Sequence, residues 1–387
     1  MTRIEADWLR AGPTQAVFAM LTDAGFQAYA VGGCVRDSLL GVTVNDIDIA
    51  TDAHPERVVA LAEAAGLHAV PTGIEHGTVT VVSSHVPHEV TTFRRDVETD
   101  GRRAVVAFSE TMDEDARRRD FTMNALYADQ LGLVHDPIGG LPDLKIRRIR
   151  FIEDAATRIR EDYLRSLRFF RFHAWYGDPG AGFDSEAIAA IAEHTEGLAT
   201  LSRERIGTEV LKLLAAPDPA PAVAGMRATG VLAAIMPGSD DRALGPLVHL
   251  ESETGTPPEA LRRLAVLGGE GLRAGLRLSR KDAAYLSAIR KAMVLSAREA
   301  GYRLGAEAAR DALLISAAST GSPVDRAALA DARAPASRTF PIRAADLMPA
   351  LSGPALGRTM ERLEQEWIDS GFVLTREELL IRAGKEG

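Results

Sequence analysis

Apolar and polar residues follow different periods in the two parts of the chain. Up to about residue 150, short runs rich in Val, Ile and Thr alternate with polar breaks, a pattern typical of half-buried strands. It predicts strands at residues 28–31, 46–50, 78–82, 89–93, 132–135 and 148–152. Beyond that point Ala, Leu, Arg and Glu recur at helical spacing, which predicts helices at residues 185–194, 203–215, 258–267 and 355–368. The predicted fold class is α+β, a β-sheet head with helices followed by an all-α remainder.

Proline and glycine mark breaks within the helical part. They cluster at residues 176–182, 216–221, 237–241 and 255–258, where they end one helix before the next begins. Residues 317–341 are rich in Ala, Ser, Pro and Asp, and they are the best candidate for an internal linker. With 387 residues the chain is too long for one core, so we expect two or three domains.

Composition narrows the class of protein. The single cysteine, Cys34, excludes a disulfide framework and favours a reducing cytoplasm. We find no apolar run of membrane-spanning length, and because the first residues include acids and no apolar run, we expect no signal peptide. The net charge of −9 argues mildly against a nucleic-acid partner. However, between Lys145 and Arg171 nine basic residues stand against four acidic ones, which keeps a local basic stripe open.

A pair of glycines follows the first predicted strand. In the segment YAVGGCVRD, Gly32 and Gly33 precede a helical pattern, so the backbone can turn tightly and direct helix N–H groups at an anion. Arg36 would add a cation at this turn, and Asp37 could orient it. The alternative is a turn with a purely structural role.

Acidic residues lie on two of the predicted strands that follow, residues 46–50 and 89–93. Asp46 and Asp48 share one face of a strand while Ile47 and Ile49 point to the other. Neighbouring carboxylates repel each other unless a cation lies between them, and Mg²⁺ binds such oxygens. If residues 89–93 form the adjacent strand, Glu89 completes a three-carboxylate site for two metal ions. Solvated acids on an exposed strand are the alternative.

Two basic segments are predicted to be helices. In residues 113–128, Asp120 and Asn124 are four apart and could bind a ribose hydroxyl, with Arg119 beside them for phosphate. In residues 160–171, Asp162 and Arg165 offer an acceptor beside a fork of donors, which matches the base edges of cytosine and adenine. The alternative in both cases is a salt-bridged surface helix.

Two further arginines follow on the second helix. Arg168 could reach a triphosphate. On an ideal helix Arg171 would lie roughly opposite Asp162, so its role stays open between nucleotide contact and structural ion pair.

Taken together these segments resemble the class II tRNA nucleotidyltransferase (CCA-adding enzyme) and bacterial poly(A) polymerase family. The matching motifs are GGCVRD, DIDIAT, EVTTFR, RRDFTMNA, HDPIGG and EDYLRSLRFFRF, in the family's order. The resemblance implies a head at residues 1–150, a neck with the base-selecting helix at 151–235, and a tRNA-binding body and tail at 236–387. It also implies that Asp46 and Asp48 hold Mg²⁺. The positions that match the family's nucleotide contacts are Gly33, Arg36, Arg119, Asp162, Arg165, Arg168 and Arg171.

The implied activity is template-independent addition of C, C and A to the 3′ end of tRNA from CTP and ATP, with release of pyrophosphate. The segment GIEHGTVTVV resembles the CCA-adding branch more than poly(A) polymerases, and residues 94–107 are not shortened as in CC-only enzymes. Poly(A) addition and partial addition remain alternatives. A phosphohydrolase is disfavoured, because the only His–Asp dipeptide is His135–Asp136.

Two other classes of protein remain to be distinguished. A non-catalytic RNA-binding module would not need Asp46, Asp48 and Glu89, and a glycosyltransferase with an Asp-x-Asp pair would have no role for the two arginine-rich segments. The oligomeric state and the choice between Glu89 and Asp120 as third metal ligand are left open by the sequence.

Overall fold

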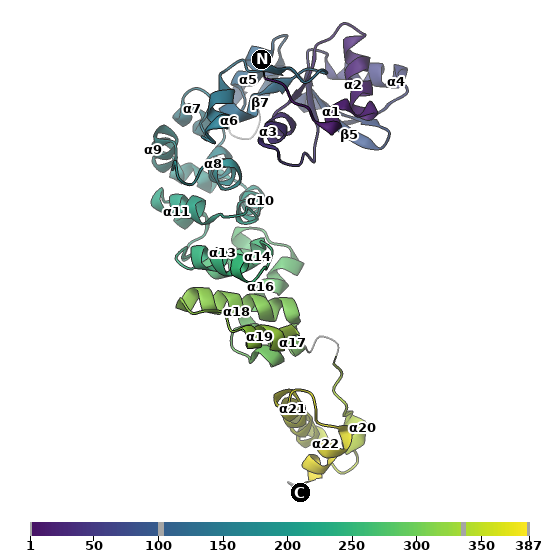
Figure 1. Cartoon of the computed structure of the whole chain (residues 1–387), viewed down its shortest axis with the longest axis vertical. Coiled ribbons are helices and arrows are strands. Elements are labelled where there is room, and N and C mark those ends of the chain that lie inside the picture. The colour runs from purple at the N-terminus through teal and green to yellow at the C-terminus, as the bar shows by residue number, and fades with distance from the viewer. Residues whose placement is uncertain (1, 100–103, 334–337, 385–387) are drawn as a thin grey trace. The chain divides into compact units, whose positions relative to one another are not determined.

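The computed structural model of the chain describes residues 2–99, 104–333 and 338–384. Contacts divide it into two compact units (Figure 1). The first contains Met1–Ile206 and Gly225–Ile235, and the second contains Gly207–Ala224 and Met236–Gly387. Mixed sheet and helices in the first unit and helices in the second confirm the predicted α+β class.

The head of the first unit is built on one mixed sheet. In the described part of the chain seven strands join it in the order β3-β4-β5-β2-β1-β8-β9. Strands β2 and β5 are parallel, and the other neighbours are antiparallel. The strands are β1 (Ala28–Val31), β2 (Asp48–Thr51), β3 (His68–Gly73), β4 (Thr78–Ser83), β5 (Val86–Thr92), β8 (Tyr127–Ala128) and β9 (Val134–His135).

A separate antiparallel hairpin follows the sheet's β5. It consists of β6 (Arg94–Thr99) and β7 (Ala104–Phe108). The sequence pattern of residues 94–107, compared above with the shortened segment of CC-only enzymes, predicts a loop, and this prediction is wrong for β6 and β7, which are paired strands. Residues 100–103, between the two strands, lie outside the described residues.

Five of the six predicted strands are present; the strand at residues 28–31 has the predicted ends, and the ends of the other four shift by at most three residues. The sixth, at residues 148–152, is wrong. There the backbone makes only an isolated bridge between Phe121 and Phe151, through Thr122 N to Arg150 O at 3.0 Å and Ile152 N to Asp120 O at 3.1 Å. The apolar side chains Ile149, Phe151 and Ile152 are nevertheless buried. Their apolar pattern therefore reflects packing in the core and not a strand in the sheet.

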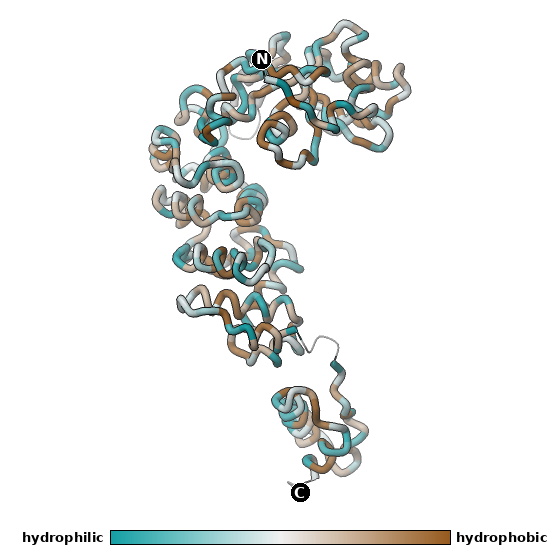
Figure 2. Tube along the Cα trace, viewed as in Figure 1, coloured by the Kyte–Doolittle hydropathy of each residue, from teal (hydrophilic) through white to brown (hydrophobic). Residues whose placement is uncertain are grey.

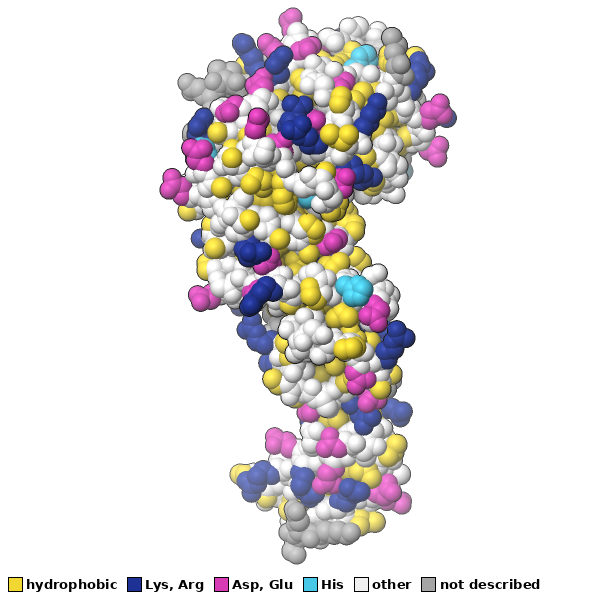
Figure 3. Space-filling view, turned by 60° about the vertical axis from the view of Figure 1, so that its left-hand side comes forward, with side chains coloured by type: hydrophobic (Ala, Val, Ile, Leu, Met, Phe, Trp, Pro, Cys, Tyr) yellow, Lys and Arg dark blue, Asp and Glu magenta, His cyan; other side chains and the backbone are white. Residues whose placement is uncertain are grey.

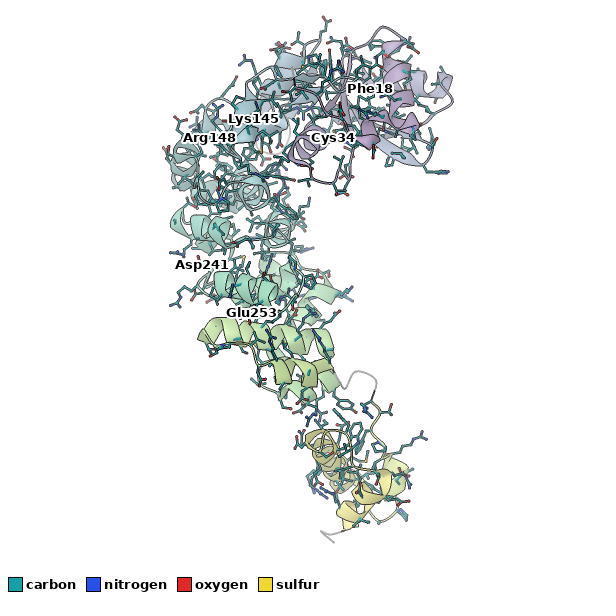
Figure 4. The ribbon with its side chains drawn as sticks, viewed as in Figure 1. Phe18, Cys34, Lys145, Arg148, Asp241 and Glu253 are labelled. Carbon is teal, nitrogen blue, oxygen red and sulfur yellow. The ribbon has the colours of Figure 1, made fainter. Side chains whose placement is uncertain are left out.

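Short helices surround the sheet. Helices α2 (Gly12–Thr22) and α4 (Pro55–Ala64) pack against β4 and β5, and α3 (Gly33–Leu40) packs against β1. Phe18 of α2 and Cys34 of α3, both labelled in Figure 4, are buried. The remaining helices of the head are α1 (Asp7–Arg10), η1 (Ile74–His76), α5 (Met112–Arg117), η2 (Thr122–Asn124) and α6 (Gly140–Lys145).

The helix predicted at residues 113–128 is wrong beyond Arg117. Helix α5 ends there, and the single turn η2 and strand β8 follow. The reason is the burial of Asp115, which is 1% exposed. Its carboxylate accepts hydrogen bonds from Arg118, Arg119 and Tyr127, and a continuous helix could not bring Tyr127, twelve residues later, to the same oxygen.

The helix predicted at residues 160–171 is two helices. Helix α7 (Ala155–Glu161) ends at Asp162, which is extended at φ −152° and ψ 105°. Helix α8 (Leu164–Tyr176) then begins, and the Asp162 carboxylate accepts from Leu164 N at 3.0 Å. Asp side chains favour such helix starts because they accept from otherwise unpaired N–H groups.

Helix α8 contributes an aromatic cluster to the first unit. Phe169 and Phe172 lie 6.3 Å and 5.0 Å from Phe121, measured between ring centroids. Phe151 stacks on Phe169 at 5.7 Å. The helices that complete the first unit are α9 (Ser185–Glu193), η3 (Thr195–Thr200), α12 (Val231–Ile235) and the start of α10 (Arg203–Leu214).

The second unit is helical, and α18 (Ala306–Thr320) lies at its centre. It contacts α13 (Leu244–Glu253), α14 (Ala260–Leu267), α16 (Arg280–Ala292) and α17 (Ala297–Leu304). Apolar positions recur along these helices (Figure 2), and those that face α18 form its core. The unit also contains α11 (Ala220–Ala228, up to Ala224), α15 (Leu272–Gly275), α19 (Arg326–Arg333), α20 (Ala344–Leu347), α21 (Gly353–Asp369) and α22 (Arg376–Ala383).

The linker predicted at residues 317–341 is only partly correct. Residues 317–320 continue α18, and α19 occupies Arg326–Arg333. Residues 334–337 lie outside the described residues. After them a second apolar cluster forms around Trp367, with Leu363, Ile368 and Phe372. The alanine-rich composition of this segment favours helices, because alanine has the highest helix propensity, and so it does not indicate a linker.

Buried charges hold the centre of the second unit. Arg262 and Arg263 of α14 are 0% and 1% exposed. Arg262 contacts Glu251 at 2.8 Å and Asp311 at 2.9 Å. Arg263 contacts the other oxygen of Glu251 at 2.7 Å and the backbone oxygen of Leu214 at 2.7 Å. Burying charge is costly unless it is paired and hydrogen-bonded, and each of these groups is.

Candidate active site

The glycine pair forms the turn that its sequence predicts. Gly32 has φ +72° and immediately precedes the first residue of α3, Gly33. A side chain at Gly32 would be strained at this φ, and its Cβ would lie 3.5 Å from Nη1 of Arg119. The turn therefore places the guanidinium of Arg119 beside the N-terminus of an eight-residue helix, where N–H groups favour an anion.

The predicted carboxylates lie on neighbouring strands. Asp48 is paired in register with Glu89 across the parallel strands β2 and β5. Asp46 is exposed just before β2, while Ile47 and Ile49 are 8% and 0% exposed. The alternation inferred from DIDIA is therefore correct, and Glu89 rather than Asp120 is the acid beside Asp48.

Electrostatic repulsion marks this group of acids. Burial raises the pKa of Asp48, the charges of Glu89 and Asp46 raise it further, and Arg119 lowers it; the result is a pKa of about 6. A cation bound beside such a carboxylate would stabilise its ionised form. Among the described residues no group of three His, Cys, Asp or Glu side chains is arranged to hold a metal ion by itself. The two carboxylates Asp46 and Asp48 nevertheless fit Mg²⁺, because this ion usually takes one or two carboxylates together with substrate phosphates and water.

Arg36 is held by three partners. It donates to Asp37 at 2.8 Å, to the side-chain oxygen of Asn124 at 2.6 Å and to the hydroxyl of Tyr176 at 2.8 Å. Its guanidinium carbon also lies 4.0 Å from the centre of the Tyr176 ring. The role of Asp37 in orienting Arg36 is thus as the sequence suggested, whereas Tyr176, 140 residues away in the chain, carried no sequence signal.

Asn124 continues this chain of contacts to helix α8. Its amide donates to Asp120 at 2.9 Å, and Arg168 donates to the other oxygen of Asp120 at 2.8 Å and 2.5 Å. Burial alone would raise the pKa of Asp120, but the charge of Arg168 and these hydrogen bonds outweigh it and lower the pKa to about 2. Asp120 and Asn124 do lie together as expected, although η2 rather than a continuous helix joins them.

Arg119 is held by a buried acid. It donates to Asp115 at 2.9 Å and to the hydroxyl of Tyr127 at 3.2 Å. Burial raises the pKa of Asp115, but the charges of Arg119 and Arg118 and the hydrogen bond from Tyr127 lower it strongly overall. The spacing of Asp115 to Arg118 and Arg119 was readable as helical i, i+3 and i, i+4 pairs, and that signal was missed.

The predicted base-selecting residues lie at the break between α7 and α8. Arg205 of α10 donates to Asp162 at 2.6 Å. Arg165 donates to the Arg158 backbone oxygen at 2.9 Å and to the carboxylate of Glu161. Among the described residues no hydrogen bond or ion pair joins the Asp162 and Arg165 side chains. Both are half-buried, each positioned by a neighbour that the sequence argument did not name.

Arg171 follows Arg165 and Arg168 at three-residue spacing on α8. The helix begins only at Leu164, so the ideal-helix argument that placed Arg171 opposite Asp162 does not apply. Its guanidinium carbon lies 4.7 Å from the centre of the Phe172 ring, and its charge reduces the effect of burial on the pKa of Tyr176. Arg171 therefore lies near the residue that holds Arg36.

Among the described residues, the face of the molecule drawn in Figure 3 shows no large area of one charge. Basic and acidic side chains are interspersed over the face drawn in Figure 3. No helix among the described residues combines the length and the apolar composition needed to cross a membrane.

Comparison with known proteins places these motifs in context. Residues 28–150 match the Poly A polymerase head domain, and residues 182–242 match the "Probable RNA and SrmB- binding site of polymerase A". A solved structure of the Bacillus stearothermophilus CCA-adding enzyme in complex with CTP is 30% identical, with a TM-score of 0.76. The match covers 96% of this chain and 98% of that one.

Curated relatives match over a shorter stretch. The human mitochondrial CCA tRNA nucleotidyltransferase 1 is 44% identical over 184 residues, which are 47% of this chain and 42% of the relative. The CCA-adding enzyme of Streptococcus pyogenes serotype M1 is 44% identical over 205 residues, which are 52% of this chain and 49% of the relative. The matched stretch thus spans about half the length of these relatives.

Proposed function

Because the chain belongs to the class II CCA-adding enzyme and bacterial poly(A) polymerase family, we propose that it adds C, C and A to the 3′ end of tRNA from CTP and ATP and releases pyrophosphate. The observation that carries the proposal is the pairing of Asp48 with Glu89. Asp48 and the turn at Gly32 both lie close to Arg119. A nucleotidyl transferase needs this combination, since it must hold a triphosphate and activate a hydroxyl at the same place.

We infer that Asp46, Asp48 and Glu89 act on the reacting atoms. Asp46 and Asp48 would hold Mg²⁺, with Glu89 beside them, and the bound ion would lower the pKa of the attacking 3′-hydroxyl and offset charge on the leaving pyrophosphate. The N–H groups at the start of α3 would bind triphosphate oxygens. Arg119, whose guanidinium lies against Gly32, would bind the same phosphates, and its ion pair with Asp115 keeps it in place.

The remaining predicted residues would bind the nucleoside. Asp162 and Arg165 would pair with the base, the first accepting from an exocyclic amine of C or A and the second donating to a ring nitrogen. Asp120 and Asn124 would bind the ribose hydroxyl, and Arg168 would reach the phosphates from the far side of Asp120. Arg36 would also contact the nucleotide, held by Tyr176, and Arg171 would either contact the nucleotide or support the structure around it.

The functional division of the chain forms part of the proposal. Residues 1–150 would be the catalytic head, 151–235 the neck with the base-selecting helix, and 236–387 a body and tail that bind tRNA. The first compact unit contains the head and most of the neck. A cytoplasmic location is proposed from the single cysteine alone.

A tRNA lacking its 3′ end tests the activity. The purified chain with Mg²⁺ should add two C residues when given CTP alone, one further A when ATP is also present, and then stop. Addition that ends after CC, or that starts only on tRNA ending in CC, would identify a partial enzyme. Long A-tails on any RNA would identify a poly(A) polymerase, the other activity named by the matching head domain.

An Asp48→Asn variant separates an enzyme from an RNA-binding module. It should lose nucleotide transfer while it still binds tRNA. Asp23→Asn is the matched control, because Asp23 is exposed at the end of α2 and its carboxylate contacts no cation among the described residues. Wild-type protein that binds tRNA but transfers nothing would reject the enzymatic assignment.

A further inference from the structure

A basic pocket lies in the second unit, separate in the chain from every residue discussed above. It has a volume of about 1010 Å³ and is formed by α15, by α16 and by the segment between them. Four arginines line it, Arg273, Arg277, Arg280 and Arg290. No Asp or Glu among the described residues lines it. In a protein of net charge −9 such a group of cations is a local exception.

The floor of the pocket is one face of α16. Arg280, Ala284, Ser287 and Arg290 are spaced by three or four residues and so lie along one side of the helix. Ala284 and Ser287, between the two arginines on this face, have small side chains, which lets a ligand approach the helix closely. Ten residues of helix separate Arg280 from Arg290 by about 15 Å along the axis.

Three of the four arginines of the pocket are available to a ligand. Arg273, Arg280 and Arg290 are exposed, and none of them makes an ion pair with another described residue. Asp282, on the same helix, instead accepts a hydrogen bond from Ser279 at 2.7 Å and lines a different pocket. Unpaired arginines cost little in water, and their planar forks fit phosphate oxygens.

That second pocket of about 590 Å³ provides a comparison within the unit. Lys281, Arg262 and Arg310 line it, but so do Glu259, Asp282 and Glu307. Cations in that pocket are balanced by acids. The all-arginine lining is therefore a property of the first pocket and not of the unit in general.

The shape and lining indicate a row of phosphates. A single nucleic-acid strand carries one phosphate per roughly 3.4 Å of helix axis, so a site about 15 Å long spans several of them. No aromatic side chain of the described residues lines the pocket, so nothing offers a base a surface on which to stack. Contacts to phosphate alone fix position without reading sequence.

We propose that the pocket between α15 and α16 binds the sugar-phosphate backbone of the RNA substrate and contributes to RNA affinity but not to base choice. This inference rests on the proposed function, because it takes the RNA to be the substrate extended at the head. We name the pocket the α15–α16 arginine pocket.

The test uses the full chain and two independent changes to the arginine pocket. Arg280→Gln with Arg290→Gln removes two cations, and its control is Arg10→Gln with Arg57→Gln, two exposed arginines of the first unit. Ser287→Glu adds an anion to the floor, and Ser287→Gln is its uncharged match of the same size. All four proteins should unfold at the wild-type urea concentration, because every changed residue is exposed.

Binding of a labelled tRNA that lacks its 3′ end is measured at several salt concentrations. We expect the double pocket variant to bind on the order of tenfold more weakly, with the slope of log affinity against log salt reduced by about 2. Ser287→Glu should weaken binding several-fold relative to Ser287→Gln. The KM for CTP and the single-turnover rate at saturating tRNA should stay at wild-type values.

Equal tRNA affinity in pocket and control variants would overturn the proposal. So would a loss that falls on CTP instead of on tRNA, or an unchanged salt slope. A wild-type chain that adds neither C nor A would refute the proposed function, yet the binding comparison would still decide whether this pocket contacts RNA.

Discussion

The contact between Asp120 and Arg168 allows a quantitative prediction. Asp120 has a 10% exposed side chain, and it lies between Arg168 and the amide of Asn124. Its pKa falls from an ordinary 3.8 to about 2 because the charge of Arg168 and the hydrogen bonds outweigh burial. That difference corresponds to about 2.5 kcal/mol of stability at neutral pH. We expect Asp120→Asn to lower the free energy of unfolding of the first unit by roughly 2 kcal/mol.

The pH dependence of this loss follows from the direction of the shift. The pKa in the folded protein lies below that in the unfolded chain, so the contribution is complete above about pH 4 and disappears as the pH falls toward about 2. The difference between wild type and Asp120→Asn should therefore be constant from about pH 7 to about pH 5 and shrink below about pH 4. Arg168→Gln should remove the same energy, and the double variant should lose little more.

The measurement needs a probe confined to the first unit. The chain has three tryptophans, of which Trp8 and Trp175 lie in the first unit and Trp367 in the second. In a Trp367→Phe background, urea unfolding followed by fluorescence reports the first unit. Asp23→Asn is the control and should change stability by less than about 0.5 kcal/mol. An Asp120→Asn protein as stable as this control at neutral pH, or a loss that persists undiminished at low pH, would refute the reasoning.

Three further predictions concern other contacts. Gly32→Ala forces a side chain into φ +72° and should cost about 1–2 kcal/mol of stability and raise the KM for both nucleotides; unchanged nucleotide kinetics would contradict the role of the turn. Arg205→Gln removes a half-buried partner of Asp162 and should change the ratio of kcat/KM for CTP and ATP severalfold while the KM for tRNA stays constant, and Arg205→Lys should restore part of it. Glu251→Gln leaves Arg262 and Arg263 without their shared buried anion and should destabilise the second unit by roughly 3–5 kcal/mol, measured through Trp367 fluorescence; a smaller effect than that of an exposed Glu→Gln change would disprove the network's importance.

The sequence predicted local features of the site well because they depend on short spacings. The alternation of Asp46, Ile47 and Asp48 needs only the two-residue period of a strand. The glycine turn before α3 needs only the conformational freedom of Gly32, which has a positive φ. The expectation that Glu89 lies beside Asp48 was conditional on strand order, and the parallel pairing of β2 with β5 meets that condition.

Helix continuity was predicted less well because it depends on contacts that are distant in the sequence. The chain leaves the helix after Arg117 because the buried carboxylate of Asp115 collects Arg118, Arg119 and Tyr127. The Asp162 carboxylate accepts a hydrogen bond from Leu164 N at the beginning of α8 and another from Arg205, 43 residues later. Periodicity in a window of ten to twenty residues cannot contain such partners. The resemblance to a family located the motifs correctly, but it did not reveal the acids and hydroxyls that hold them.

The arginines of the candidate active site are hydrogen-bonded to acceptors within the protein, which affects both their charge and their mobility. Arg36, Arg119, Arg165 and Arg168 each donate to an oxygen of the protein itself. Pairing lowers the positive potential that a triphosphate would meet, so on charge alone these contacts weaken nucleotide binding. They also fix long side chains that would otherwise lose rotamer freedom on binding, at a cost of about 0.5–1.5 kcal/mol each. A guanidinium has five N–H donors, and an acceptor on one edge leaves others directed outward. The arginines of the site therefore carry less net charge but point in fixed directions, whereas Arg273, Arg280 and Arg290 of the α15–α16 arginine pocket are exposed and make no ion pair with another described residue. Base selection requires fixed donors, and sequence-independent contact with a phosphate backbone does not.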